Sequence, residues 1–223
     1  MLVVVGGHTR NIGKTSVVAG LIAALPELNW TAIKITQYGH GVCSSAGEPC
    51  ECAVTDVDHP YAVSRETDDV SGTDSSRYLA AGARRSYWVR TAAGQLAYAV
   101  PEIRSIFETS EHAIVESNSI LQFFRPDLYL AVMDFGAKDF KATNLAYLDR
   151  ADALILIDRG NEQPLWSGVS RGLWESKPQF RVRPPQYVTA VMAALVKGRL
   201  RSPTTSSGVT AGPVPNAGPC DAR

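Results

Sequence analysis

The sequence predicts an α/β protein built on a mostly parallel sheet with helices on both faces. The first observation is a series of short apolar runs, rich in β-branched residues, that have the length of buried strands. The second is that segments with apolar residues at helical spacing lie between these runs. Strands that alternate with helices need crossover connections, which make neighbouring strands parallel and cover both faces of the sheet.

The expected strands, in chain order, are residues 2–6, 31–36, 112–117, 128–134 and 153–158. Residues 86–92 are a sixth candidate, which we expect nearer an edge of the sheet. Helices are expected from residue 14 onward and over residues 75–83, 94–108 and 184–198. Pro101 should kink or divide the third of these helices, because proline has no N–H to donate inside a helix.

These elements predict a single domain over residues 1–200. Residues 37–74 break the alternation and are rich in Gly, Ser, Asp and Cys, so we expect an irregular Cys-rich insertion that carries function. Residues 201–223 have no periodicity and are dense in Pro, Gly, Ser and Thr, which predicts a disordered tail.

The composition excludes several classes of partner. Lys+Arg and Asp+Glu both number 22, so the net charge gives no reason to expect nucleic acid or an anionic membrane surface as a partner. No apolar run approaches the roughly 20 residues that a membrane span needs. The first residues lack the basic segment of a signal peptide and are expected to form a strand, so we expect a cytoplasmic protein.

A glycine-rich turn, G-G-H-T-R-N-I-G-K-T-S, follows the first strand and opens the first helix. This context is typical of a phosphate-binding loop, whose usual pattern is G-x-x-x-x-G-K-[ST]. Here five residues separate Gly7 from Gly13, and His8 stands where the usual pattern has glycine. We interpret the turn as an intact phosphate loop of a longer kind, in which His8 lies over the phosphates.

The loop predicts a site for ATP or GTP with Mg²⁺. Backbone N–H groups of such a loop and of the helix N-terminus surround the phosphates. Lys14 would reach the β and γ phosphates, and the Thr15 hydroxyl would bind Mg²⁺. The expected nucleotide-binding residues are Gly7, His8, Thr9, Arg10, Asn11, Ile12, Gly13, Lys14, Thr15 and Ser16.

Acidic residues close several of the expected strands. In open α/β sheets the ligand crevice lies beyond the carboxyl ends of the strands, so these acids are well placed to meet Mg²⁺ or its waters. Glu116 is the first candidate and Asp134 the second, so the expected Mg²⁺ residues are Thr15, Glu116 and Asp134, and the expected catalytic residues Lys14, Thr15 and Glu116. The alternative is that such acids only cap loops or helices, which is how we interpret Asp158.

The length of the loop resembles that of the dethiobiotin synthetases and the cobyrinic acid a,c-diamide synthase group, which carry G-T-x-T-x-V-G-K-T. Thr9 and Ile12 keep the threonine and the aliphatic residue of that pattern. The resemblance implies an ATP-dependent enzyme that activates a carboxylate. It also implies that Lys34, about twenty residues after the loop lysine, contacts an anionic substrate or phosphate.

The segment V-S-G-T-D-S-S-R-Y-L-A-A-G-A, residues 70–83, resembles a signature of the MobB-like accessory proteins of molybdopterin-guanine dinucleotide biosynthesis. Asp74 and Arg77 match that signature, whereas Thr73 replaces its lysine. The resemblance implies a homodimer that binds nucleotide and serves a partner enzyme of cofactor biosynthesis. Asp74 and Arg77 would then belong to the second-substrate site with Lys34; the alternative is a surface ion pair at i,i+3 spacing.

Both resemblances fall within the SIMIBI class of P-loop NTPases, which predicts the fold more firmly than either family does. The preference between adenine and guanine stays open. No N-K-x-D follows a strand, and in G-A-K-D, residues 136–139, the lysine and aspartate are adjacent.

A cluster of cysteines and histidines lies in the expected insertion, and it consists of His40, Cys43, Cys50, Cys52 and His59. Three thiolates and one imidazole can hold Zn²⁺ in a tetrahedral structural site. The fourth ligand would be His59 or alternatively His40, and the other interpretation is three reduced thiols in a loop. An iron–sulfur cluster is the third alternative, although the common spacing for one is missing.

Three functions follow from these features. The first is a MobB-like accessory protein that binds NTP·Mg²⁺ and hydrolyses it slowly. The second is an ATP-dependent ligase that resembles dethiobiotin synthetase, and the third is a metallochaperone or metal sensor switched by NTP turnover.

Overall fold

The computed structural model describes residues 1–38 and 60–201 and confirms the α/β class. Eight strands form one sheet in the order β3-β4-β2-β5-β1-β6-β7-β8. Every neighbouring pair is parallel except β3 and β4. The strands are β1 (Leu2–Gly7), β2 (Thr31–Tyr38), β3 (Tyr61–Arg65), β4 (Arg85–Ala92), β5 (Ala113–Glu116), β6 (Leu128–Asp134), β7 (Ala153–Ile157) and β8 (Gln179–Val182).

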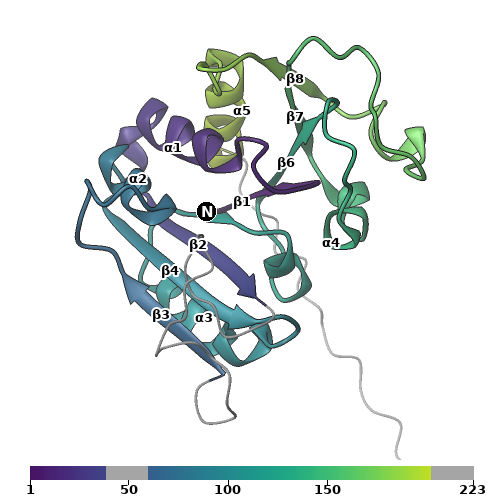
Figure 1. The fold of residues 1–223 in the computed structure, drawn as a ribbon. Coiled ribbons are helices and arrows are strands. Elements are labelled where there is room, and N and C mark those ends of the chain that lie inside the picture. Colours follow the sequence, from purple (N-terminus) through teal and green to yellow (C-terminus); the bar gives the residue numbers. More distant parts are fainter. Residues whose placement is uncertain (39–59, 202–223) are drawn as a thin grey trace, which may run out of the picture.

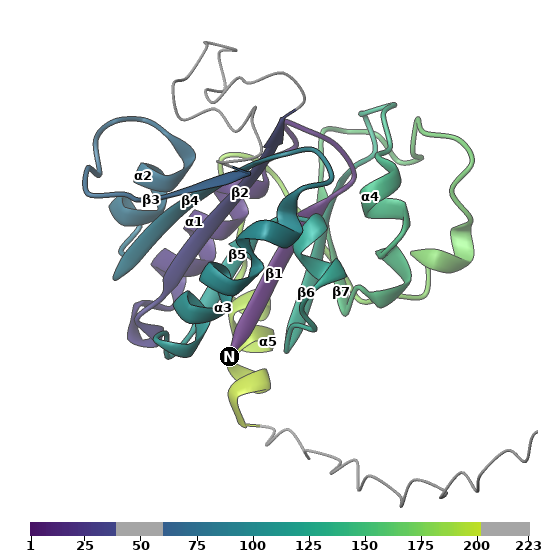
Figure 2. The same ribbon diagram turned by 90° about the horizontal axis from the view of Figure 1, so that it is seen from below.

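Helices cover both faces of this sheet (Figures 1 and 2). The α-helices are α1 (Lys14–Ala24), α2 (Asp74–Ala80), α3 (Val100–Glu108), α4 (Ala142–Leu145) and α5 (Ala190–Arg201). Short 3₁₀ helices are η1 (Pro26–Leu28), η2 (Leu96–Ala99), η3 (Ser119–Gln122), η4 (Leu148–Arg150) and η5 (Arg171–Leu173). None of the helices in residues 1–38 and 60–201 is both long and apolar enough to cross a membrane.

The alternation of side chains along the strands divides the core into two clusters, one on each face of the sheet. One cluster joins alternate residues of β1, such as Val3 and Val5, to α1, α5 and Tyr78 of α2. The other joins Val4 to α3, η3 and a set of aromatic residues between β6 and β8. Because both faces are buried, β1, β5 and β6 are almost entirely apolar up to the acids that end β5 and β6, as expected for parallel strands between two helical layers.

Strand β1 lies near the middle of the sheet, with β5 on one side and β6 on the other. The loop that follows it therefore lies at the carboxyl edge of the sheet, between the ends of β5 and β6. In open α/β sheets this edge forms the ligand crevice. The fold thus brings the turn after Gly7 and the acids that end β5 and β6 to the same edge.

One expected helix is divided as predicted, and another begins later than expected. Residues 94–108 are divided as Pro101 predicts, into η2 and then α3, which has the proline in its first turn. The helix expected from residue 184 begins only at Ala190. The preceding segment instead crosses α1, with Tyr187 against Gly13 and Val188 against Gly20.

The expected insertion at residues 37–74 is only partly described. Its described part contains the antiparallel edge strand β3, so it is not irregular throughout. The acidic side chain of Glu66, just after β3, accepts from the Ser75 and Thr73 hydroxyls and so ties this strand to the start of α2. The remaining part carries the cysteines and lies outside the described residues, as does the tail from residue 202.

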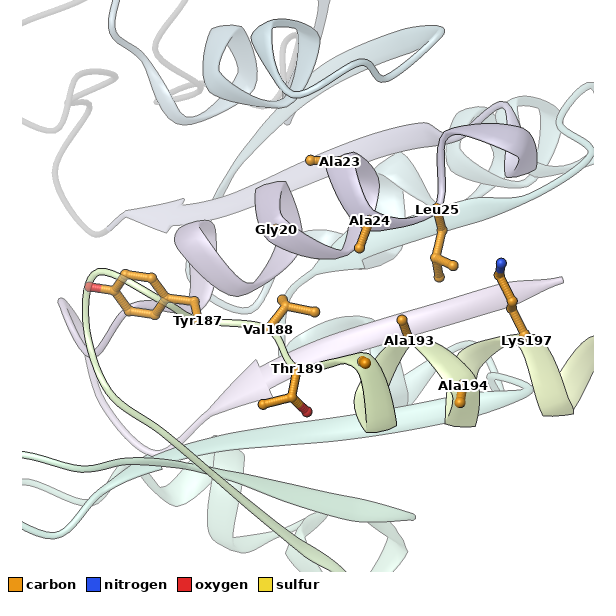
Figure 3. A pocket seen from close by; sticks show the side chains of 11 residues that line it. Gly20, Ala23, Ala24, Leu25, Tyr187, Val188, Thr189, Ala193, Ala194 and Lys197 are labelled. Carbon is orange, nitrogen blue, oxygen red and sulfur yellow. The ribbon is translucent and has the colours of Figure 1, made fainter.

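A groove with a volume of about 660 Å³ runs between α1 and α5 (Figure 3). Its walls are small or apolar residues such as Gly20, Ala24 and Ala193, and Tyr187 lies at one end. Tyr187 contacts Gly13, so the groove ends beside the phosphate loop.

The end of β1 is packed so tightly that it requires glycine. A Cβ added to Gly6 would overlap Asn118 Oδ1 and lie 2.9 Å from the Tyr129 ring. We therefore expect Gly6→Ala to lower the free energy of unfolding by about 1–3 kcal/mol. Urea denaturation measures the change, and Gly172→Ala is the control, because its nearest neighbour would be Ser170 Oγ at 3.7 Å. Equal stabilities of the two variants would contradict this packing.

Candidate nucleotide-binding site

The side chain of Asn118 holds the backbone at the first residue of the loop, Gly7. The Gly7 N–H donates to Asn118 Oδ1 at 2.9 Å, and Asn118 Nδ2 donates to the Gly7 carbonyl at 2.8 Å. Asn118 lies two residues after the end of β5, so the neighbouring strand fixes where β1 ends. Asn118 was not predicted from the sequence, although an amide close to the end of a strand was the available signal.

Further along, the loop takes two left-handed backbone conformations, at Asn11 (φ 58°) and Gly13 (φ 94°). Such angles favour glycine, and asparagine tolerates them better than most residues. A Cβ at Gly13 would also lie 2.6 Å from the Tyr187 ring. Gly13 is therefore required both by its backbone angle and by the packing of Tyr187.

Lys14 turns back into its own loop. Its Nζ donates to the Thr9 carbonyl at 2.6 Å. Burial lowers the pKa of Lys14 to about 8, although the nearby Glu116 carboxylate opposes the shift. A buried ammonium that rests on a loop carbonyl is placed to exchange that carbonyl for a phosphate oxygen.

His8 occupies a different position from the one expected. Its ring is fully buried and packs against Phe140 and Trp166, with ring centroids 5.1 and 4.8 Å away. Nδ1 donates to the Asp139 carbonyl at 2.8 Å, and Nε2 accepts from the Asp134 N–H at 3.0 Å, an arrangement that fixes the neutral tautomer. Burial also lowers the pKa of His8. The backbone N–H of His8 is bonded to the Val132 carbonyl. His8 therefore anchors the loop to the β6 side rather than facing a nucleotide.

A segment after β6 covers the loop. The Thr9 hydroxyl donates to Asp139 Oδ2 at 2.5 Å, and the Lys141 N–H donates to the His8 carbonyl at 2.7 Å. Burial lowers the pKa of Lys141, and the positive charge of Arg10 acts in the same direction. The sequence analysis considered this segment only as a base-recognition motif and missed its contacts with the loop.

The other side of the loop meets a buried carboxylate. Glu116 ends β5, is 2% exposed, and accepts the Thr15 hydroxyl at 2.8 Å. The Tyr78 hydroxyl donates to the same carboxylate oxygen. Burial and the adjacent carboxylate raise the pKa of Tyr78 well above its usual range, so Tyr78 stays a hydrogen-bond donor. Tyr78 belongs to the 70–83 segment but was not singled out from the sequence.

The structure brings Lys34 and Asp74 to this same carboxylate. Lys34 Nζ lies 2.5 Å from Glu116 Oε1 and 2.7 Å from Asp74 Oδ2. Burial alone would lower the pKa of Lys34, but the two carboxylates outweigh it and raise that pKa. Burial alone would raise the pKa of Asp74, but its interactions with Lys34 and Thr15 outweigh burial and lower that pKa. Lys34, Asp74, Glu116 and Thr15 thus form one network beside the loop.

Arg77 is the remaining residue expected in the second-substrate site. It lies one turn after Asp74 on α2, and its guanidinium donates to Ser16 Oγ at 3.0 Å. It is also 3.9 Å from Asp74 Oδ1, which is the surface pair considered as its alternative role. Arg77 therefore connects α2 to the start of α1, and its role in a second-substrate site stays a prediction.

The carboxylate of Asp134 is bonded to residues other than Thr15. Its Oδ2 lies 2.7 Å from Arg159 Nε, and its Oδ1 accepts from the Gly136 N–H at 2.8 Å. These partners lie on the β6–β7 side of the loop, away from the Thr15 hydroxyl that Glu116 and Asp74 share. Asp158 accepts from the Gly160 N–H and pairs with Arg183, which is the loop-capping role expected for it.

The expected zinc ligands cannot be placed in the same way. Cys43, Cys50, Cys52, His40 and His59 lie outside the described residues. Within residues 1–38 and 60–201, no three His, Cys, Asp or Glu side chains come together as a metal-binding group.

A glycine-rich turn between the central strand β1 and helix α1, with Lys14 and Thr15 at the helix start, gives this chain the P-loop NTPase fold. Comparisons with protein-family models and with curated proteins find no match. Among solved structures, the chain is similar to the "apo" form of LpxK from Aquifex aeolicus in complex with ATP, with a TM-score of 0.46 and 17% identity over 81% of this chain and 53% of that one. It is also similar to HypB from Helicobacter pylori in complex with nickel, with a TM-score of 0.46 and 12% identity over 89% and 84% of the two chains. The chain spans about half the length of LpxK.

The position of His8 predicts a structural role. We expect His8→Ala to lower the free energy of unfolding by about 2–4 kcal/mol, because it removes two buried hydrogen bonds and two ring contacts. Nucleotide affinity of the folded variant should change by less than about tenfold, because the backbone bonds that hold the loop survive. Urea denaturation and calorimetry measure the two quantities. A large loss of affinity with unchanged stability would instead place His8 at the nucleotide.

Proposed function

We propose that this chain binds a nucleoside triphosphate with Mg²⁺ at the phosphate loop and hydrolyses it slowly. The proposal rests on one observation. Beside a loop whose backbone is hydrogen-bonded on both sides lies a cluster formed by Lys14, Thr15, Lys34 and Glu116. Phosphates would accept from the loop N–H groups and from the start of α1, which adds the positive end of its dipole. Lys14 would leave the Thr9 carbonyl for the β and γ phosphates.

The donor set beside Thr15 fits Mg²⁺. Mg²⁺ prefers oxygen ligands, keeps several waters and is usually held by one or two carboxylates together with phosphate oxygens. Thr15 Oγ1 and the carboxylates of Glu116 and Asp74 supply such oxygens within one network. We propose Asp74 as the second acid in place of Asp134, because Asp134 is held by Arg159.

Slow turnover follows from the same network. Hydrolysis needs a group that orients or deprotonates the attacking water. The acids beside the loop in the described part of the chain are already engaged, Glu116 with Lys34 and Thr15, and Asp139 with Thr9. None of them is a free general base, so rapid hydrolysis would require a rearrangement.

A MobB-like accessory role in cofactor biosynthesis is the function we favour. The segment that resembles the MobB-like signature begins α2 and reaches the loop through Asp74 and Arg77. A segment in contact with the metal-binding threonine and with Ser16 is placed to respond to the γ phosphate. A partner enzyme would sense this response, and the family resemblance implies that it acts in molybdenum cofactor assembly and that the chain is a homodimer.

An ATP-dependent, carboxylate-activating ligase is the second candidate. It is favoured by the length of the loop and by the cations beside it, because the positive charges of Arg10 and Lys34 both act on Lys141. A carboxylate held there would receive the γ phosphoryl group. Release of ADP that depends on an added carboxylate would favour this candidate over the accessory role. The metallochaperone alternative depends on cysteines outside the described residues.

Nucleotide binding is tested by Lys14→Ala. We expect the affinity for ATP or GTP to fall by at least about a hundredfold, because the variant removes the ammonium that would bind the β and γ phosphates. Isothermal titration calorimetry against both nucleotides measures the loss and also decides the base preference. Lys197→Ala is the control, since Lys197 pairs with Glu27 on the surface. Unchanged affinity in Lys14→Ala would reject the phosphate-loop assignment.

The metal assignment is tested by a pair of isosteric variants. We expect Asp74→Asn to raise the Mg²⁺ concentration needed for half-maximal NTP hydrolysis by about tenfold or more, because one carboxylate ligand is weakened. Asp134→Asn should leave that concentration within about twofold of the wild type, because its partner is Arg159. If Asp134→Asn raised this Mg²⁺ concentration more than Asp74→Asn did, Asp134 would be the metal ligand instead.

A further inference from the structure

Lys34 lies in an unusual place for a lysine. It is on β2 in the interior of the sheet, and the register of β2 with β5 sets it directly opposite Glu116. Its side chain is only 18% exposed. Residues directly opposite each other on neighbouring strands point to the same face, so the pairing of Lys34 with Glu116 is built into the sheet.

The ammonium of Lys34 is surrounded by the same oxygens that fit a metal ion. It lies 2.5 Å from Glu116 and 2.7 Å from Asp74. The Thr15 hydroxyl donates to Glu116 and also lies beside Asp74. A positive charge therefore already stands between the two acids on which the Mg²⁺ assignment depends.

The charges around this network oppose a metal ion that arrives alone. Lys34 is paired with the two carboxylates, and Lys14 and Lys141 act electrostatically on the same region. Adding two positive charges beside three ammonium groups is unfavourable at such short range. A nucleoside triphosphate brings several negative charges with the metal, and its phosphate oxygens can receive the displaced ammonium.

We propose that Lys34 holds the cation position in the nucleotide-free protein, so that a divalent metal enters only together with the nucleotide. This inference rests on the proposed function. When the metal binds Glu116 and Asp74, the flexible stem of Lys34 swings its ammonium toward the phosphates. Lys34 is thus a positioning residue that couples metal binding to nucleotide binding.

Such coupling is reciprocal. If the nucleotide raises the affinity for metal by some factor, the metal raises the affinity for nucleotide by the same factor. Removing the ammonium should raise the affinity for metal in the absence of nucleotide, and the coupling factor should shrink. The prediction concerns metal binding by itself and does not need turnover.

Lys34→Met tests the proposal, because it keeps most of the unbranched side chain and removes its charge. Mn²⁺, which is paramagnetic, replaces Mg²⁺ as the probe, and the free ion is counted by electron paramagnetic resonance without nucleotide. We expect the variant to bind Mn²⁺ at least about tenfold more tightly than the wild type does. Adding Asp74→Asn to Lys34→Met should remove the gain. Equal Mn²⁺ affinities of Lys34→Met and the wild type would overturn the proposal.

Two further variants distinguish displacement of the Lys34 ammonium by the metal from a general effect of nearby positive charge. Lys34→Arg keeps the positive charge and should not gain Mn²⁺ affinity. Lys141→Met removes a neighbouring cation that does not bridge the two acids, and its Mn²⁺ affinity should change by less than about threefold. A gain in Lys141→Met as large as that in Lys34→Met would show a general charge effect and overturn the proposal.

The loss of Lys34 leaves two carboxylates without their shared partner, which destabilises the fold. If Lys34→Met folds poorly, its melting temperature is the second readout, since Mn²⁺ should raise it more than in the wild type. An equal effect of Mn²⁺ on both proteins would again count against the proposal. All these titrations are done without nucleotide, so their outcome is independent of whether Lys14→Ala supports nucleotide binding.

Discussion

The site depends on one buried carboxylate, that of Glu116. A carboxylate that is 2% exposed needs several partners to offset the loss of water, and Glu116 has Thr15, Tyr78 and Lys34. These partners come from α1, α2 and β2, so satisfying this one charge fixes two helices relative to the sheet. The arrangement that stabilises the carboxylate is also the one on which the proposed metal site depends.

The loop itself is held from both neighbouring strands. On the β5 side Asn118 bonds both backbone groups of Gly7, and on the β6 side the His8 ring and backbone bond to the chain between Val132 and Lys141. A loop anchored in this way keeps its N–H groups oriented before any phosphate arrives, which lowers the cost of binding. His8, which stands where the usual motif has glycine, is part of this anchoring.

Much of the fold could be predicted, because apolar runs of strand length and helical periodicity are local signals. The five main strands were found, and Pro101 divided its helix as expected. The start of α5 was misplaced because Tyr187 and Val188 pack across α1, a contact between distant segments. The phosphate loop was found from its spacing, whereas the roles of Tyr78, Asn118 and Lys141 depend on neighbours far away in the chain.

The sequence by itself determined the fold class, the phosphate loop and a short set of charged candidates at strand ends, because glycine angles, strand patterns and helix starts are set by nearby residues. Only the tertiary structure decided how these candidates are grouped. It brought Lys34 and Asp74 to Glu116, turned His8 into the core and paired Asp134 with Arg159. The physical reason is that strand order and register decide which charges meet, and hydrogen bonding and burial then decide which of them remain paired inside the protein.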